Sequence, residues 1–167
     1  MSFGGAGVVW GRGSGEIATV VFDTSIYIPY FRGEAYRELV ESETRRGRNR
    51  VSSVVLQELY AGTRSPADKC LLDDLNQAFA TRGLLLTPEH DEWVLTGQLL
   101  NQHGRRYGFL TPRHHVADIL ILLSAVRAGA VLITENVQDF SAWLKLLRRR
   151  RVSGAVLGVR RGDHRVK

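Results

Sequence analysis

The sequence of 167 residues contains a single cysteine, Cys70, so an internal disulfide framework is excluded. One cysteine fits a reducing compartment, and we expect the protein in the cytoplasm. No apolar run is long enough to cross a membrane, so we expect no membrane association. The first sixteen residues lack the basic start and apolar centre of a signal peptide. These absences argue against secreted disulfide-rich proteins and against membrane proteins.

The sequence also lacks internal repeats and the two common glycine-rich phosphate motifs, GxGxxG and GxxxxGK[ST]. Residues 1–16 are rich in glycine without periodicity, and we expect a flexible leader there. One α/β domain is predicted over residues 17–160, followed by a basic tail at 161–167. Lys and Arg number 23 against 17 Asp and Glu, for a net charge of +6. This excess of basic residues is compatible with a phosphate-rich partner such as RNA.

Apolar segments typical of strands alternate with helical patterns along the chain. The segment 116–125 is apolar nearly all round, which predicts a buried helix. Val131, Leu132 and Ile133 form a short apolar run, as in a strand that is covered on both faces. Strands are predicted at 17–22, from 51, at 84–86, at 131–133 and at 155–159, with helices between them. The pattern predicts an α/β fold, a three-layer α/β/α sandwich with a central parallel β-sheet.

Four acidic residues follow strands or begin helices in this pattern. Asp23 follows the first strand, and Glu58 lies about two turns into the helix after the second. Asp118 lies near the start of the helix before the strand at 131–133, and Asp139 follows that strand. Because parallel strands end, and crossover helices begin, at one edge of the sheet, all four acids are expected there.

Each acid also has an ordinary structural explanation when it is taken alone. Asp23, with Thr24 and Ser25, could cap the short helix that follows the first strand. Glu58 could be an exposed helical glutamate, and Asp118 could interact with a helix dipole. Asp139 could be the N-cap of a helix that begins near Phe140. Only convergence of the acids would distinguish a functional site from these explanations.

Four carboxylates within a few ångströms would repel one another and could not all stay ionised without cations. Hard oxygen ligands without Cys or His favour Mg²⁺ or Mn²⁺ over Zn²⁺. Zinc is a weaker alternative, because the adjacent His114 and His115 would point about 100° apart on a helix. An acidic metal pocket within a basic surface suits hydrolysis of a phosphodiester.

The segment Gly104 to Arg113 is predicted to be a loop that leads into the helix carrying Asp118. Its arginines, Arg105, Arg106 and Arg113, could overhang the acidic site and contact substrate phosphates. A solvated loop without such a role is an equally good explanation.

Four segments, VFDTSIYI, SSVVLQELYAG, ADILILLSA and LITENVQDF, resemble the signature segments of the PIN-domain ribonucleases. Within that superfamily they are most similar to VapC-type toxins of toxin–antitoxin pairs, over roughly residues 19–159. The resemblance implies that Asp23, Glu58, Asp118 and Asp139 are the metal-binding and catalytic acids, that Thr24 and Thr134 supply hydroxyls lining the site, and that Asn136 is a supporting polar residue. Glu135 departs from the family pattern, where a basic residue is common.

The resemblance also implies an activity and a set of partners. It implies an endoribonuclease that uses Mg²⁺ or Mn²⁺ to hydrolyse RNA. It further implies a homodimer and a small cognate antitoxin protein that fills the active site.

Three alternatives remain open at the level of sequence. A magnesium-dependent phosphohydrolase of the haloacid dehalogenase type would need a second Asp at position 25, which is Ser25 here. A receiver-like domain would need a lysine at a late strand end, and Lys69, Lys145 and Lys167 are all elsewhere. A PIN fold retained only to bind RNA or protein is the third.

Overall fold

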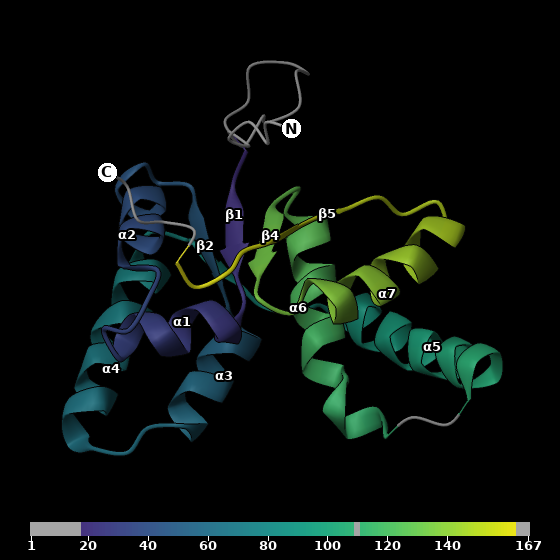
Figure 1. Cartoon of the computed structure of the whole chain (residues 1–167), viewed down its shortest axis with the longest axis horizontal. Helices are drawn as coiled ribbons and strands as arrows, with labels where there is room; N and C mark the ends of the chain where they lie inside the picture. The colour runs from purple at the N-terminus through teal and green to yellow at the C-terminus, as the bar shows by residue number, and fades with distance from the viewer. Residues whose placement is uncertain (1–17, 109–110, 163–167) are drawn as a thin grey trace, which may run out of the picture.

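The computed structural model describes residues 18–108 and 111–162. The leader predicted at 1–16 and residues 163–167 of the predicted tail lie outside these ranges. The elements are β1 (Val20–Phe22), α1 (Thr24–Phe31), α2 (Arg37–Arg45), β2 (Asn49–Ser52), α3 (Ser53–Ala61), α4 (Pro66–Thr81), β3 (Leu85–Leu86), α5 (His90–Tyr107), the 3₁₀ helix η1 (Pro112–His114), α6 (Val116–Arg127), β4 (Val131–Thr134), α7 (Val137–Arg149) and β5 (Ala155–Gly158) (Figure 1). None of the helices in the described ranges is long and apolar enough to span a bilayer.

The described residues form a five-stranded parallel sheet with the strand order β3-β2-β1-β4-β5. β1 is central, and its Val21 pairs with Arg50 of β2 on one side and Leu132 of β4 on the other. The chain moves outward from β1 in both directions, so the strand order reverses between β1 and β4. In open parallel sheets, ligands bind at the carboxyl edge beside such a reversal.

Helices flank the sheet, which confirms the predicted α/β/α architecture. Figure 1 shows α1 to α4 gathered beside β2 and α5 to α7 gathered beside β4 and β5. α6 is the most central helix and packs against α3, α5, α7 and β4. Ile119, Ile121 and Leu122 of α6 are fully buried, as the all-round apolar pattern predicts.

The segment after Gln102 differs from the sequence prediction. The loop predicted from Gly104 is wrong over its first part, because α5 continues to Tyr107 and ends at Gly108. Gly108 has φ +95°, a conformation that favours glycine, so the helix ends there rather than at Gly104. Arg105 and Arg106 therefore lie in the last turn of a helix. From this helix they line the groove between α5 and the end of α7.

Two glycines with opposite surroundings provide a test of this packing. A Cβ at Gly158 of β5 would lie 2.9 Å from Val137 Cβ at the start of α7, so the strand could not keep its position. We expect Gly158→Ala to destabilise the fold by about 1–3 kcal/mol through overpacking. Gly104 lies within α5, and a Cβ added there would meet nothing within 4 Å, so Gly104→Ala should stabilise by about 0.5–1 kcal/mol. Urea unfolding of both variants measures the difference, and equal effects would contradict the packing of β5 on α7.

Candidate active site

Asp23 is the most firmly held of the four acids. It follows β1 directly, is 4% exposed, and acts as the N-cap of α1. Its Oδ2 accepts hydrogen bonds from the hydroxyls of Ser25, at 2.8 Å, and Thr134, at 2.9 Å. Its backbone N–H donates to the carbonyl of Ile133 at 3.0 Å. Asp23 is therefore fixed where β1 and β4 end side by side.

The same hydroxyls bind the backbone that follows β4. Thr134 is fully buried, and its Oγ1 accepts the Asn136 N–H at 2.9 Å. Ser25 Oγ accepts the Glu135 N–H at 3.0 Å, so it links the two strand ends. From the sequence, Ser25 served only to argue against a phosphohydrolase that needs a second aspartate at that position, and its link between the ends of β1 and β4 was not predicted. Two consecutive hydroxyl residues, Thr24 and Ser25, next to Asp23 are the sequence feature that could have indicated this link.

Glu58 lies on the side of the site formed by α1 and α3. It is half-buried in α3 and accepts a hydrogen bond from the hydroxyl of Thr24. The alternative of an exposed helical glutamate is therefore wrong. The bond joins residues 34 positions apart and orients Glu58 relative to the end of β1.

Asp118 lies in the first turn of α6, as predicted, and is half-buried. Within the described ranges its carboxylate accepts no hydrogen bond, so it has no capping role. Burial is the largest cause that raises the pKa of Asp118, followed by the charges of Asp23, Glu58 and Asp139, and together they raise it to about 7. The three other predicted acids therefore lie close enough to Asp118 at this edge of the sheet to repel its charge.

Asp139 is the most accessible of the four. α7 begins at Val137 with Asn136 at its N-cap position, so the alternative of Asp139 as an N-cap is wrong. Asp139 instead lies exposed in the first turn of α7.

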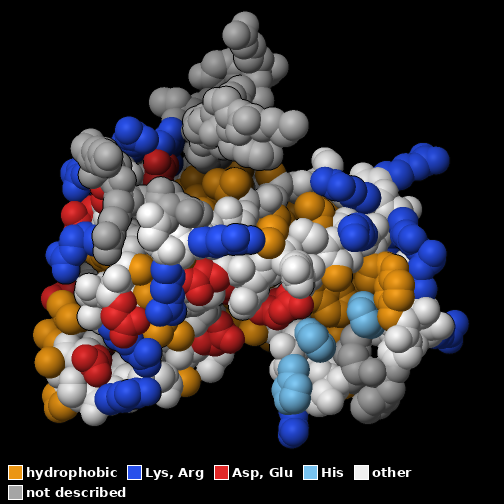
Figure 2. Space-filling model, in the orientation of Figure 1, with side chains coloured by type: hydrophobic (Ala, Val, Ile, Leu, Met, Phe, Trp, Pro, Cys, Tyr) orange, Lys and Arg blue, Asp and Glu red, His pale blue; other side chains and the backbone are white. Residues whose placement is uncertain are grey.

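Figure 2 shows acidic side chains gathered near the middle of one face of the molecule, beside a hollow between the two halves of that face.

The acids fit a divalent cation in their chemistry but do not form a preassembled cage. In the ranges 18–108 and 111–162, no three Asp, Glu, His or Cys side chains are arranged to hold a metal ion. A bound cation would offset the repulsion that Asp118 receives from the other three acids. Hard oxygen ligands of this kind suit Mg²⁺ or Mn²⁺. His115 packs against the Trp143 ring, with centroids 5.5 Å apart, which leaves carboxylates as the chemistry of the site.

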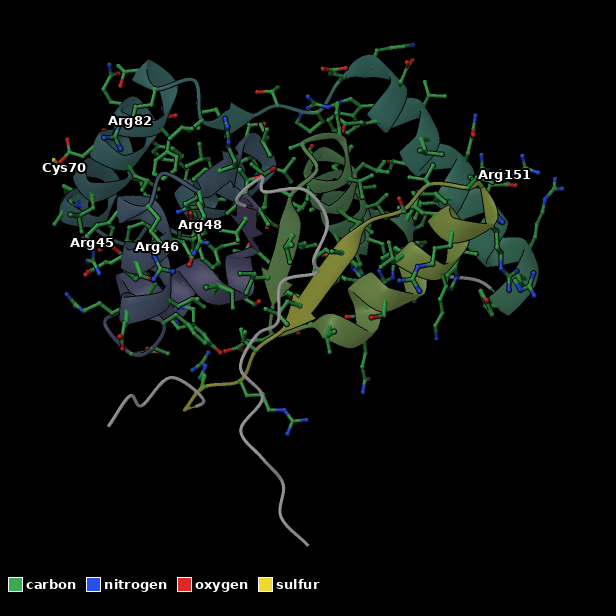
Figure 3. All side chains as sticks on the ribbon, turned by 90° about the horizontal axis from the view of Figure 1, so that it is seen from above. Arg45, Arg46, Arg48, Cys70, Arg82 and Arg151 are labelled. Carbon is green, nitrogen blue, oxygen red and sulfur yellow. The ribbon has the colours of Figure 1, made fainter. Side chains whose placement is uncertain are left out.

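Much of the basic charge lies away from the site or is paired. Arg45 forms an ion pair with Glu41, and both Arg46 and Arg48 pair with the buried Glu43. Figure 3 shows these three arginines together at one end of the molecule, with Arg151 at the opposite end. The arginine cluster around residue 48 is therefore partly neutralised.

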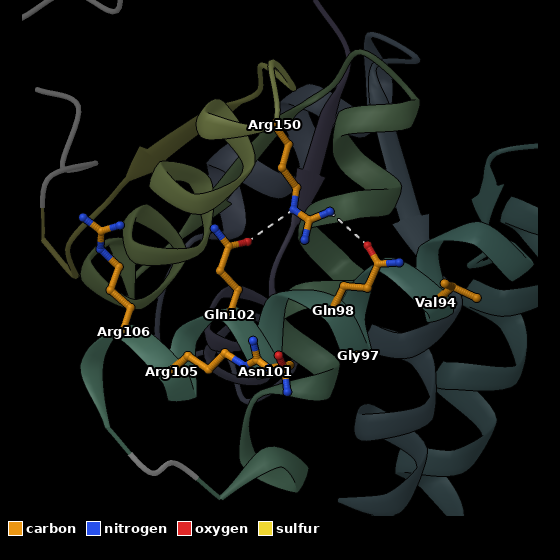
Figure 4. A pocket seen from close by; sticks show the side chains of 8 residues that line it. All are labelled: Val94, Gly97, Gln98, Asn101, Gln102, Arg105, Arg106 and Arg150. Atoms are coloured by element: carbon orange, nitrogen blue, oxygen red, sulfur yellow. Dashed lines mark hydrogen bonds between the residues drawn. The ribbon is translucent and has the colours of Figure 1, made fainter.

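The arginines proposed from sequence as phosphate contacts lie in two places. Arg105 and Arg106 line a groove of about 820 Å³ between α5 and the end of α7, together with Arg150 (Figure 4). Arg150 is oriented there by Gln98, at 2.9 Å, and Gln102, at 3.3 Å. None of the four acids lines this groove. Arg113 is exposed in η1, shortly before α6.

Comparison with known protein families identifies the family of this chain. The family model described as "PIN domain" matches residues 20–151, which includes all four acids. The chain belongs to the PIN-domain family. PIN domains are usually nucleases, so the family match favours a nuclease over the phosphohydrolase and receiver alternatives. No curated protein matches the sequence.

Solved structures similar to this PIN domain share its fold at low sequence identity. A DNA-bound VapBC complex from Salmonella typhimurium is 20% identical, with a TM-score of 0.57 over 85% of this chain and 98% of the other. FitAcB from Neisseria gonorrhoeae is 16% identical, with a TM-score of 0.59 over 84% and 97%. VapBC-5 from Mycobacterium tuberculosis, a member of the VapBC family of toxin–antitoxin systems, is 19% identical, with a TM-score of 0.51 over 86% and 100%.

Proposed function

We propose that this PIN domain is a metal-dependent endoribonuclease that hydrolyses RNA phosphodiester bonds. The observation that carries the proposal is the repulsion of Asp118 by the three other acids at the carboxyl edge of the sheet, beside the ends of β1 and β4. A chain gains no stability by placing like charges together, so their placement points to a cation that binds them. The basic balance of the whole chain, +6, suits a polyanionic substrate.

Asp23, Glu58, Asp118 and Asp139 would hold Mg²⁺ or Mn²⁺, which supplies an activated water and steadies the leaving oxygen. The remaining contributions come from the chain itself. Thr134 and Ser25 fix the rotamer of Asp23, and Thr24 does the same for Glu58. Such preorganisation reduces the entropy lost when ligand and substrate bind.

Asp118 and Asp139 lie in the first turns of α6 and α7. The first N–H groups of a helix have no partner within the helix. Helix N-termini attract anions, so they favour binding of the phosphate that is to be cleaved. Asp139 is exposed and is therefore the acid that approaching substrate meets first.

The proposal is tested by incubating purified protein with total RNA in Mg²⁺ or Mn²⁺, with and without EDTA. We expect cleavage that EDTA abolishes and that added metal restores. Asp118→Asn protein purified in parallel serves as the control for contaminating ribonucleases, and a DNA of matching sequence tests the substrate class. Cleavage that EDTA leaves unchanged would contradict the metal mechanism. An absence of cleavage with every RNA would favour a non-catalytic binding module.

We also propose that the protein is the toxin of a toxin–antitoxin pair and that it forms a homodimer. The structural relatives named as VapBC and FitAcB complexes support the pairing with an antitoxin.

A groove of about 210 Å³ between α1, α3 and α4 begins at Glu58 and offers an apolar surface for a partner peptide. Ile28 and Leu71, which line it, are 37% and 55% exposed. A short reading frame immediately upstream, encoding a DNA-binding protein, would be the expected antitoxin gene.

A further inference from the structure

A second groove adjoins the acidic site on the side of β5. It has a volume of about 550 Å³, enough for a nucleotide-sized ligand. One wall is the turn from β4 into α7, residues 135–139, and the other is the segment 158–160 that follows β5. Asp139 belongs to the first wall, so the groove opens directly from the proposed catalytic acids. It is therefore placed to hold the part of a substrate that flanks the reacting group.

Arg160 is the cation of this groove. Its side chain lines the groove and is exposed, and within residues 18–108 and 111–162 it makes no ion pair. The adjacent Arg161 differs, because its Nε lies 3.0 Å from Glu135 Oε1 and its guanidinium also pairs with Glu34 at 3.4 Å. Arg161 is therefore neutralised by its neighbours, whereas no described acid neutralises Arg160.

The residues on both sides of Arg160 are fixed to the body of the protein. Val159 is buried, and its N–H donates to the Thr134 carbonyl at 2.9 Å. Arg161 is held by Glu135, which also accepts a hydrogen bond from the Tyr36 hydroxyl at 2.6 Å. A glycine at position 158 lets this segment pass close to Val137. Arg160 is consequently held at the mouth of the groove by structure on both sides.

We propose that Arg160 binds an RNA phosphate next to the scissile one, and that Glu135 and Arg161 are positioning residues for it. This inference rests on the proposed ribonuclease function and adds the path of the substrate strand. A guanidinium that forms no ion pair with the described residues, beside a group of acids, matches a phosphodiester chain. The reacting phosphate would lie over the acids, and the neighbouring phosphate would meet the guanidinium. The same network gives a reason for the acidic residue at position 135, where the family commonly has a basic one, because Glu135 forms an ion pair with Arg161.

Binding of a fluorescein-labelled RNA 12-mer of random sequence tests the proposal, with fluorescence anisotropy measured over a KCl series in Mg²⁺. All variants carry Asp118→Asn, so that RNA is bound without being cleaved. We expect Arg160→Ala to weaken binding about five-fold and to lower the salt slope by about 0.7, the value for one contact to single-stranded nucleic acid. Arg160→Lys should keep the salt slope, because the charge remains.

Arg82→Ala is the matched control for loss of one positive charge. Arg82 is the C-cap of α4 and precedes β3, so it lies at the amino edge of the sheet, opposite the edge of the four acids. We expect its salt slope to equal that of the parent. A slope that is unchanged in Arg160→Ala, or lowered equally in Arg82→Ala, would overturn the role of Arg160.

Glu135→Ala separates positioning from simple electrostatics. Removal of an acid near bound RNA would by itself raise the affinity, whereas loss of the anchor for Arg161 should lower it about three-fold or more. A rise in affinity would overturn the positioning role. If the parent protein binds no RNA at all, the proposed function fails together with this inference. If it binds RNA and Arg160→Ala has no effect, only the inference fails.

Discussion

Replacement of Asp118 by asparagine is expected to abolish RNA cleavage and, without metal, to make the protein more stable. Loss of a residue that only hydrogen-bonds to a metal ligand typically lowers activity about 10–100-fold. The loss here should be larger, because Asp118 is proposed to be a ligand itself. The gain in stability arises because Asp118 is half-buried, accepts no hydrogen bond from the described residues and is repelled by three neighbouring acids. Asparagine has nearly the same shape and no charge.

The pH dependence of this effect has a definite sign. The pKa of Asp118 is raised from 3.8 to about 7 in the folded protein, so ionisation of the folded state is unfavourable. The protonated carboxyl stabilises the fold below pH 4, and that contribution is lost as the pH rises through about 7. Metal-free wild type should therefore lose stability between pH 4 and 7 relative to Asp118→Asn.

The expected size of this difference follows from the same pKa. The full difference between 3.8 and about 7 corresponds to about 4 kcal/mol. Solvent screens a half-buried carboxylate, so we expect about 1–2 kcal/mol above pH 7, a rise of a few degrees in Tm. Mg²⁺ should raise the Tm of wild type more than that of the variant, because a ligand stabilises in proportion to its occupancy.

Melting curves of both proteins in EDTA and in excess Mg²⁺, at pH 5 and pH 8, measure these effects. A variant that melts below wild type in EDTA yet keeps the full wild-type shift in Mg²⁺ would make Asp118 a structural residue. The proposed metal site would then have to exclude it.

Asp23→Ala should also abolish cleavage, but it should change stability in the opposite direction. Asp23 caps α1 and accepts a hydrogen bond from the hydroxyl of the fully buried Thr134. Loss of the cap costs about 1 kcal/mol, and a buried hydroxyl without its acceptor costs about 1–3 kcal/mol. Relief of the repulsion with Asp118 offsets part of this, so we expect a net loss of about 2–3 kcal/mol and a Tm lower by roughly 5–10 °C.

Asp23→Asn is the matched control, because its amide oxygen can still accept hydrogen bonds from Thr134 and Ser25. It should lose cleavage as fully as Asp23→Ala while keeping most of the stability. Urea unfolding in EDTA, with cleavage assayed on the same preparations, distinguishes the two roles. Equal stability of Asp23→Ala and wild type would show that the hydrogen bonds around Asp23 contribute nothing to the fold.

The sequence predicted the sheet and the edge at which the four acids lie because both follow from local patterns. The apolar run at 131–133 and the all-round apolar helix beginning at Val116 identify elements that must be buried. Once the strands are parallel, an acid after a strand and an acid at the start of a crossover helix share an edge. Asp23 and Asp118 were placed in this way without knowledge of any contact.

Helix ends were predicted less well, for a physical reason. α5 runs through Gly104 to Gly108 because a glycine in a helix costs only about 1 kcal/mol, which packing along the rest of the helix can offset. The first turn of α7 begins two residues before Asp139, since Asn136 rather than Asp139 takes the N-cap position. Local propensity differs too little between neighbouring positions to settle such boundaries.

The sequence by itself thus determined the α/β architecture, the order of the acids and the edge at which they lie, because periodicity and parallel topology fix these. Only the tertiary structure decided which groups touch them. Thr24 meets Glu58 across 34 residues and Thr134 meets Asp23 across 111, while Arg161 reaches Glu135 from beyond β5. Such pairs depend on strand register and on the close passage of β5 along α7, and no local pattern in the sequence specifies which residues become neighbours there.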